Sequence, residues 1–211
     1  MRARTTAVLV PALAGLVLLT GCVLKRSKNA QVFVLEPVAA QGAAAPADAP
    51  VAVVGVLKVT VPGWIDRPQM VTRAVGSQIV TDEFARWGEP IARGAQRVLA
   101  ENLAALLPER RVVRAPFPPR EPVEWRVDVA ITELARQADG TVLLEALWAV
   151  LGKKGEVLVQ RRSTHPATPS AAGAPGPAAG ASDALAELSR EIAGALRALP
   201  LPPAENEQTG K

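Results

Sequence analysis

Nucleophilic and metal chemistry in proteins depends largely on cysteine and histidine, and this chain of 211 residues contains one of each. Cys22 closes an apolar N-terminal run, and His165 is followed directly by a proline. A catalytic dyad needs a nucleophile in contact with a base, and a zinc site needs several Cys or His ligands. We therefore expect no Ser-His or Cys-His dyad, no metal site and no cofactor.

Carboxylates are the remaining candidates for acid–base chemistry. Two neighbouring predicted strands, 125–135 and 141–151, carry Asp128, Glu133 and Glu145. On these strands the carboxylates could in principle pair as acid and base. General acid–base catalysis requires such groups to face one another at a substrate. Solvated strand residues are the simpler interpretation, and we expect the protein not to be an enzyme.

Cys22 has another chemistry open to it, the acylation of its thiol. Arg2 and Arg4 precede an apolar run from Ala7 that ends in Leu19-Thr20-Gly21-Cys22. A basic start followed by a short apolar run is typical of a signal peptide, and this ending is a bacterial lipobox. A plain secretory signal or a buried cysteine is the alternative, but the single cysteine occupies the position that the lipobox requires. We predict a signal peptide over 1–21, lipidation of Cys22 and a lipidated tether over 22–31.

The mature chain begins with an anchor that also indicates a location. Two or more acyl chains hold a protein stably on a membrane. The second residue of the mature chain is Val23, whereas Asp at this position retains enterobacterial lipoproteins in the inner membrane. We therefore expect an outer-membrane protein, lipid-anchored at the periplasmic face. Lys25, Arg26 and Lys28 then form either a soluble tether or a contact with anionic headgroups.

Charge argues against nucleic-acid binding. Removal of residues 1–21 takes away two arginines and no acid, which leaves 22 basic and 20 acidic residues. A nucleic-acid-binding surface usually carries a basic stripe. The small, scattered excess here predicts no nucleic-acid partner.

Periodicity predicts a single α+β domain over residues 32–200. Apolar residues recur at helical spacing from Ile91 to Pro108 and from Ser182 or Asp183 to Leu199. Strands are predicted at 32–35, 51–61, 70–73, 78–81, 111–114, 125–135, 141–151 and 157–164. Since each helix has one apolar face, we expect a mainly antiparallel sheet with both amphipathic helices packed on one face.

Two further stretches lack periodicity. Residues 166–182 are almost entirely Pro, Ala, Gly and Ser, and residues 201–211 form a polar tail. Loops of such length and composition are uncommon inside compact domains. We expect a disordered insertion over 166–182 and a disordered tail over 201–211.

The turn Gly63-Trp64-Ile65-Asp66-Arg67 lies between two prolines and is the candidate for contact with a partner. Large aromatic and charged residues often dominate protein interfaces. Trp64, Asp66 and Arg67 are the proposed contact residues. The alternative is structural, with Asp66 binding nearby backbone N–H groups and Arg67 pairing with a carboxylate.

The same region carries a resemblance. The stretch P-x-W-I-D-R-P-Q-M-V-T-R, then R-W-G-E-P-I, then a Leu/Ala-rich helix resembles the PqiC-type auxiliary lipoproteins, and the likeness extends from about Val32 to Leu199. Family members often have Tyr-Tyr-Leu in the first strand, where this chain has Phe33-Val34-Leu35.

The resemblance implies a function. It implies a non-enzymatic outer-membrane lipoprotein that serves an ABC/MCE-type intermembrane lipid transport system. The protein would dock at the outer-membrane end of a periplasmic MCE tunnel, where several copies could form a ring. The alternatives are a stand-alone lipid- or small-molecule-binding lipoprotein, which would need a large cavity, and a hydrolase, which would need two acids facing one another.

Overall fold

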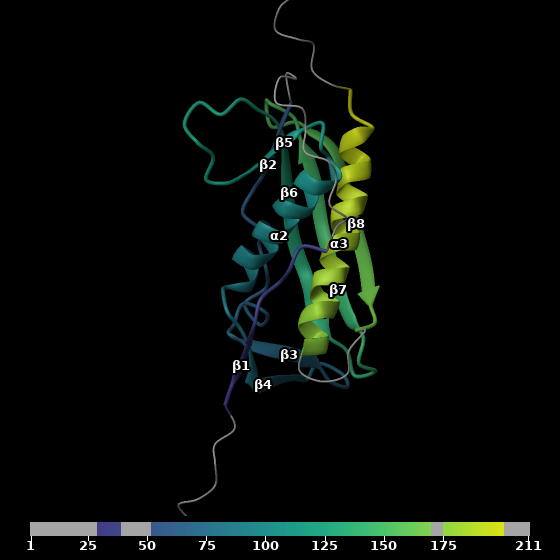
Figure 1. The fold of residues 1–211 in the computed structure, drawn as a ribbon. Helices are drawn as coiled ribbons and strands as arrows, with labels where there is room; N and C mark the ends of the chain where they lie inside the picture. The colour runs from purple at the N-terminus through teal and green to yellow at the C-terminus, as the bar shows by residue number, and fades with distance from the viewer. Residues whose placement is uncertain (1–28, 39–51, 170–174, 201–211) are drawn as a thin grey trace, which may run out of the picture.

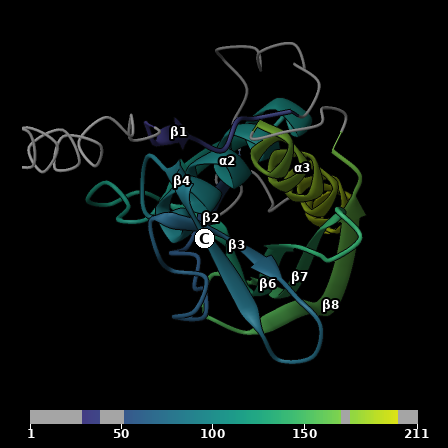
Figure 2. The ribbon, with the colours of Figure 1, turned by 90° about the horizontal axis from the view of Figure 1, so that it is seen from below.

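Both helices lie on one face of a twisted sheet, as Figures 1 and 2 show. The structure is a computed structural model that describes residues 29–38, 52–169 and 175–200. Cys22 and the tail 201–211 lie outside the described residues. The described elements, in chain order, are β1 (Gln31–Phe33), β2 (Val53–Val56), β3 (Gln69–Arg73), β4 (Ile79–Trp87), α2 (Ile91–Leu106), β5 (Arg111–Arg114), β6 (Val123–Arg136), β7 (Val142–Leu151), β8 (Val157–Ala167) and α3 (Pro175–Arg197).

The long strand β6 is the centre of the sheet. β7 pairs antiparallel along one edge of β6, and β8 pairs antiparallel with β7. The other edge of β6 carries β2 and, by a single pair at Thr72 and Arg136, β3. β2 is also parallel to β5, β4 is antiparallel to β3, and β1 is parallel to β4. The α+β fold with two helices is confirmed, and the sheet is mixed, with its longest pairings antiparallel.

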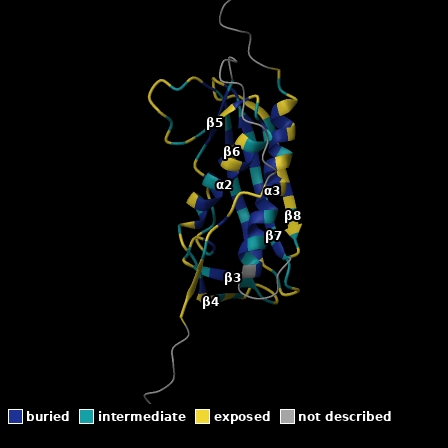
Figure 3. Cartoon of the chain, viewed as in Figure 1, coloured by how far each residue is buried: buried dark blue, intermediate teal, exposed yellow. Residues whose placement is uncertain are grey.

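Alternation along β6 and β7 places the core between the sheet and the helices (Figure 3). From Trp125 to Ile131, every second residue of β6 is buried. A bulge between Ile131 and Glu133 then shifts the alternation, so that Leu134 pairs with the buried Leu144. The bulge also places Glu133 opposite Glu145, outside the apolar alternation.

The helices contribute the apolar stripes that the sequence predicts. On α2 the buried members include Ile91, Ala95, Val98, Leu99 and Leu103. On α3 they include Leu185, Leu188, Ile192 and Leu196. The two helices pack against each other, α3 packs on β7 and β8, and α2 packs near β5.

The expected disordered insertion over 166–182 is wrong at both ends, because β8 continues to Ala167 and a helix covers the second half. α3 begins at Pro175, not at Ser182, so residues 175–182 form its first two turns. Ala178 and Ala181 are buried there, and a Cβ on Gly180 would lie 2.8 Å from Val142 Cγ2. Small residues therefore allow the helix to approach β7 closely. Prolines in a first helical turn are tolerated because those N–H groups have no helical partner.

Residues 34–38, which we call the N-terminal strap, cross both helices in an extended conformation (Figure 1). Leu35 is 1% exposed and belongs to the main core. Arg97 Nη2 donates to Leu35 O at 2.8 Å. The backbone N–H of Glu36 donates to Ser182 Oγ, and that of Val38 donates to Asn102 Oδ1. The strap therefore joins the N-terminal strand β1 to the two helices.

Candidate functional site

The loop Gly63–Arg67 is held at its centre, and two of its five residues are exposed. The backbone N–H groups of Ile65 and Asp66 donate to Pro62 O at 2.9 and 3.0 Å. The Ile65 side chain is buried in the core, whereas Gly63 and Asp66 are exposed. A tight turn with one buried side chain has a fixed backbone. Its exposed residues are therefore presented in a defined geometry.

Trp64 is part of a stack that continues to the sheet. It is half-buried and packs against the main core. The Arg73 guanidinium carbon lies 4.8 Å from the centroid of its ring, which is the range of a cation–π contact. Arg73 in turn holds Glu133 with two hydrogen bonds, Nε to Oε1 at 3.0 Å and Nη2 to Oε2 at 2.7 Å. These bonds raise the pKa of Arg73 above its ordinary value, against the opposing effect of burial.

The same contacts decide the role of the candidate acids. Glu133 is 7% exposed, and its carboxylate is bound by Arg73. Glu145 lies opposite it on β7, and Asp128 is exposed further along β6. The structure therefore brings Glu133 and Glu145 together, but Glu133 takes part in a structural ion pair.

His165 lies on β8, where its Nε2 is 3.2 Å from Glu191 Oε2 on α3. Ser163, two residues earlier, is buried, and its hydroxyl accepts a hydrogen bond from Trp148 Nε1 at 2.9 Å. The histidine thus joins the last strand to the last helix. The nearby serine hydroxyl is bonded to the indole, so the observed contacts are those of packing between β7, β8 and α3.

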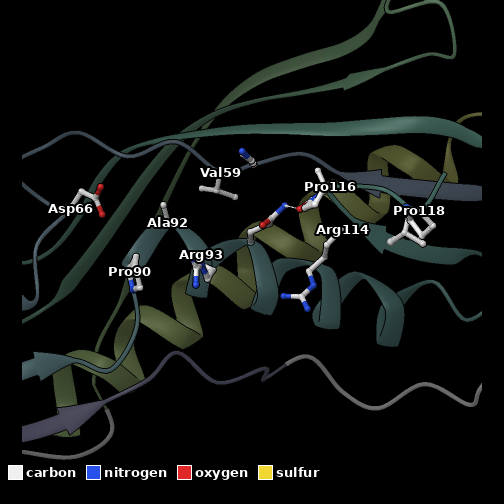
Figure 4. A pocket seen from close by; sticks show the side chains of 12 residues that line it. Val59, Asp66, Pro90, Ala92, Arg93, Arg114, Pro116 and Pro118 are labelled. Atoms are coloured by element: carbon white, nitrogen blue, oxygen red, sulfur yellow. Dashed lines mark hydrogen bonds between the residues drawn. The ribbon is translucent and has the colours of Figure 1, made fainter. Parts of the chain in front are cut away.

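A cleft of about 830 Å³ opens beside Asp66 (Figure 4). Its walls come from the first turn of α2, the segment that follows β2, and the end of β5. The apolar lining consists of Val59, Pro90, Ala92, Val113, Ala115, Pro116 and Pro118. Clefts of this size are typical of small-molecule sites.

Gln96 ties the walls of the cleft together. Its Nε2 donates to Val56 O at 3.2 Å and to Ala115 O at 3.0 Å, the second of which is the dashed line in Figure 4. One amide on α2 therefore satisfies carbonyl groups at the ends of both β2 and β5. Gln96 is buried, so these bonds hold the helix and the two strands in a fixed relation.

Lys58, Arg93 and Arg114 bring three positive charges to the cleft. Figure 4 shows Arg93 and Arg114 between Asp66 at one end and Pro118 at the other. Sequence reasoning missed these three residues because they lie on elements far apart in the chain. Of the predicted contact residues, Asp66 lines the cleft, Trp64 stacks on Arg73, and Arg67 is half-buried.

Two searches of the described residues concern other kinds of site. No described helix is both long and apolar enough to cross a membrane. Within the same residues, no group of three or more His, Cys, Asp or Glu side chains could hold a metal ion.

Solved structures share this fold. An uncharacterized protein matches with a TM-score of 0.67 at 18% identity, over 80% of this chain and 99% of its own. A protein from Xanthomonas campestris of the DUF330 family matches with a TM-score of 0.65 at 16% identity, over 79% of this chain and 94% of its own. At such identities the likeness concerns the fold alone. No curated protein sequence matches the chain.

The sequence comparison is more specific than the structural one. Residues 33–193 match the family described as ABC-type transport auxiliary lipoprotein component. This range includes the strap, the Gly63–Arg67 loop, the cleft and most of α3. Because the match spans well over half of the sequence, the chain belongs to the family of ABC-type transport auxiliary lipoprotein components.

Proposed function

We propose that this lipoprotein is a non-enzymatic auxiliary component of an MCE-type intermembrane lipid transport system. It is anchored by Cys22 at the periplasmic face of the outer membrane, and it docks at the outer-membrane end of a periplasmic MCE tunnel. Membership of a transport auxiliary family supports a role in an ABC-type transport assembly. The MCE partner and the outer-membrane location are the further steps of the proposal.

The Gly63–Arg67 loop is the proposed docking surface, and its construction carries this part of the proposal. Ile65 in the core and Trp64 under Arg73 fix the backbone, while Asp66 stays exposed with its charge unpaired among the described residues. A rigid loop loses little conformational entropy when it binds a partner. Several copies arranged as a ring would present this loop repeatedly around the tunnel mouth.

A photoreactive amino acid at position 66 tests the docking surface. In cells that produce both proteins, we expect ultraviolet light to link position 66 to the MCE protein. The matched control is the same amino acid at Arg162, an exposed residue of β8. Both side chains are exposed, so neither replacement should disturb the core. Equal adducts from both positions, or none from position 66, would remove this loop from the interface.

A stand-alone lipid- or small-molecule-binding lipoprotein is the second candidate, and the cleft of about 830 Å³ favours it. The two functions differ in their dependence on a partner. A stand-alone carrier would retain its bound lipid in cells that lack the MCE protein, whereas an auxiliary component would lose it.

A further inference from the structure

The lining of the cleft includes three cations, and none of them is paired with a carboxylate of the described residues. The side chains of Lys58, Arg93 and Arg114 take part in no hydrogen bond or ion pair with another described residue, whereas Arg73 and Arg97 both hold carboxylates. A group of unpaired cations in a concave site is typical of a binding site for anions.

The N-terminal end of α2 adds to the positive charge of the cleft. α2 has no acidic residue in its first turn and no side-chain cap, and Arg93 lies in that turn. The N-terminus of a helix carries a partial positive charge and free N–H groups, so it attracts anions and repels a cation such as Arg93. The nearest carboxylate in sequence, Glu89, is held by Arg97 at 2.7 Å.

The one acid of the lining leaves the balance positive. Asp66 lies at the far end of the cleft from Pro118, and it forms no ion pair with the three cations (Figure 4). Three positive charges and one negative charge give the lining a net charge of +2. The rest of the wall is apolar, with Val59, Val113 and Pro116 among its residues. An occupant would therefore combine an anionic group with an apolar part.

We infer that the cleft binds the phosphate group of a phospholipid, with Arg93 and Arg114 as its principal ligands and Lys58 as a third. Guanidinium groups form paired hydrogen bonds to phosphate oxygens, and an ammonium adds a point charge. The volume exceeds that of a phosphate ion and leaves room for the glycerol backbone beside the valine and proline wall. Free phosphate shares the same chemistry and is the other source of the anion.

The anion site stands on the cleft alone, whereas its use for a transported lipid rests on the function proposed above. The two can fail separately. Loss of crosslinking at position 66 would contradict docking and leave phosphate binding untouched. Absence of phosphatidylglycerol binding to the purified protein would contradict the site and leave docking untouched.

The test is calorimetric titration of the mature chain, residues 22–211, carrying Cys22→Ala so that no acyl anchor contributes. The probes are dihexanoyl phosphatidylglycerol below its micellar concentration, inorganic phosphate, and dihexanoyl glycerol, which lacks the phosphate. We expect phosphatidylglycerol to bind more tightly than either of the other two. Binding should weaken as salt is raised, because salt screens exposed charges.

The decisive variant is Arg93→Gln with Arg114→Gln, and Arg136→Gln with Arg162→Gln is the matched control. All four arginines are exposed, and both doubles remove two charges. The variant with Arg93→Gln and Arg114→Gln should bind phosphatidylglycerol about ten-fold or more weakly than the parent protein, because hydrogen bonds to charged groups are lost. The control should bind as the parent does, and both should keep the parent melting temperature.

Three results would overturn the inference. Equal weakening by both doubles would mean that the effect is one of net charge. Equal binding of dihexanoyl glycerol and phosphatidylglycerol would mean that the phosphate is not recognised. If inorganic phosphate binds as tightly as phosphatidylglycerol, the cleft is a site for small anions and does not recognise a phospholipid headgroup.

Discussion

At the scale of single residues, Leu35 connects the N-terminal strand to the core. Its side chain is 1% exposed, and its carbonyl accepts a hydrogen bond from Arg97. Arg97 is itself held by Glu89 and Glu101, and the bond to Glu89 is the largest cause of its raised pKa. The strap is therefore fixed by one apolar side chain and by a guanidinium that stays charged.

Leu35→Ala should lower the free energy of unfolding by about 2–5 kcal/mol, the range for truncation of a buried leucine. Urea denaturation of the purified protein measures this. Val32→Ala, at a side chain that is 64% exposed, is the control and should change stability by less than about 0.5 kcal/mol. Equal effects of the two changes would mean that the strap does not pack in solution.

Arg110 shows how a charged residue can serve packing. Its side chain is buried, and its guanidinium carbon lies 4.4 Å from the centroid of the Trp125 ring. Burial lowers the pKa of Arg110 from its ordinary value, and nearby Glu109, at 3.7 Å, partly opposes that shift. The planar guanidinium thus covers the indole of Trp125 on β6.

At the scale of elements, α3 depends on how closely it approaches the sheet. A Cβ at Gly180 would lie 2.8 Å from Val142 Cγ2, whereas a Cβ at Gly194 would meet nothing within 4 Å. Both glycines are inside the same helix. They differ in whether a strand lies against them.

Gly194→Ala should raise the free energy of unfolding by about 0.5–1 kcal/mol, because alanine loses less backbone entropy in a helix. Gly180→Ala gains the same propensity but overpacks against Val142, so it should be less stable than Gly194→Ala by about 1–3 kcal/mol. Thermal unfolding of the two variants measures the difference. Equal stabilisation by both would contradict the contact between the start of α3 and β7.

At the scale of the whole molecule, the position of β1 limits how far the domain can lie from a membrane. β1 begins at Gln31, so only residues 22–30 can act as a tether between the proposed anchor and the fold. An extended chain of that length spans at most about 30 Å. The domain would therefore remain close to the surface that holds its lipid.

Cys22→Ala should remove labelling by radioactive palmitate and release the protein from the membrane fraction. The melting temperature of the domain should not change, because residue 22 lies well before the first described strand. Gel autoradiography and fractionation check the first two outcomes. A variant that remains labelled and membrane-bound would place the anchor elsewhere in the chain.

Features with local signals could be predicted from the sequence. The alternation from Trp125 to Ile131 and the apolar stripe of α2 were predicted and are confirmed. The period of a strand or helix is a property of neighbouring residues. The lipobox is equally local, which is why Cys22 could be proposed without a fold.

Features that depend on distant contacts were decided only by the tertiary structure. Residues 175–182 have the composition of a linker, yet they are helical because β7 offers a surface that only small side chains can approach. The strap is ordered because α2 and α3 together supply its hydrogen-bond partners. The cleft gathers Lys58, Arg93 and Arg114 because Gln96 joins α2 to the ends of two strands. No local pattern encodes such meetings, since each depends on where the folded chain brings separate elements into contact.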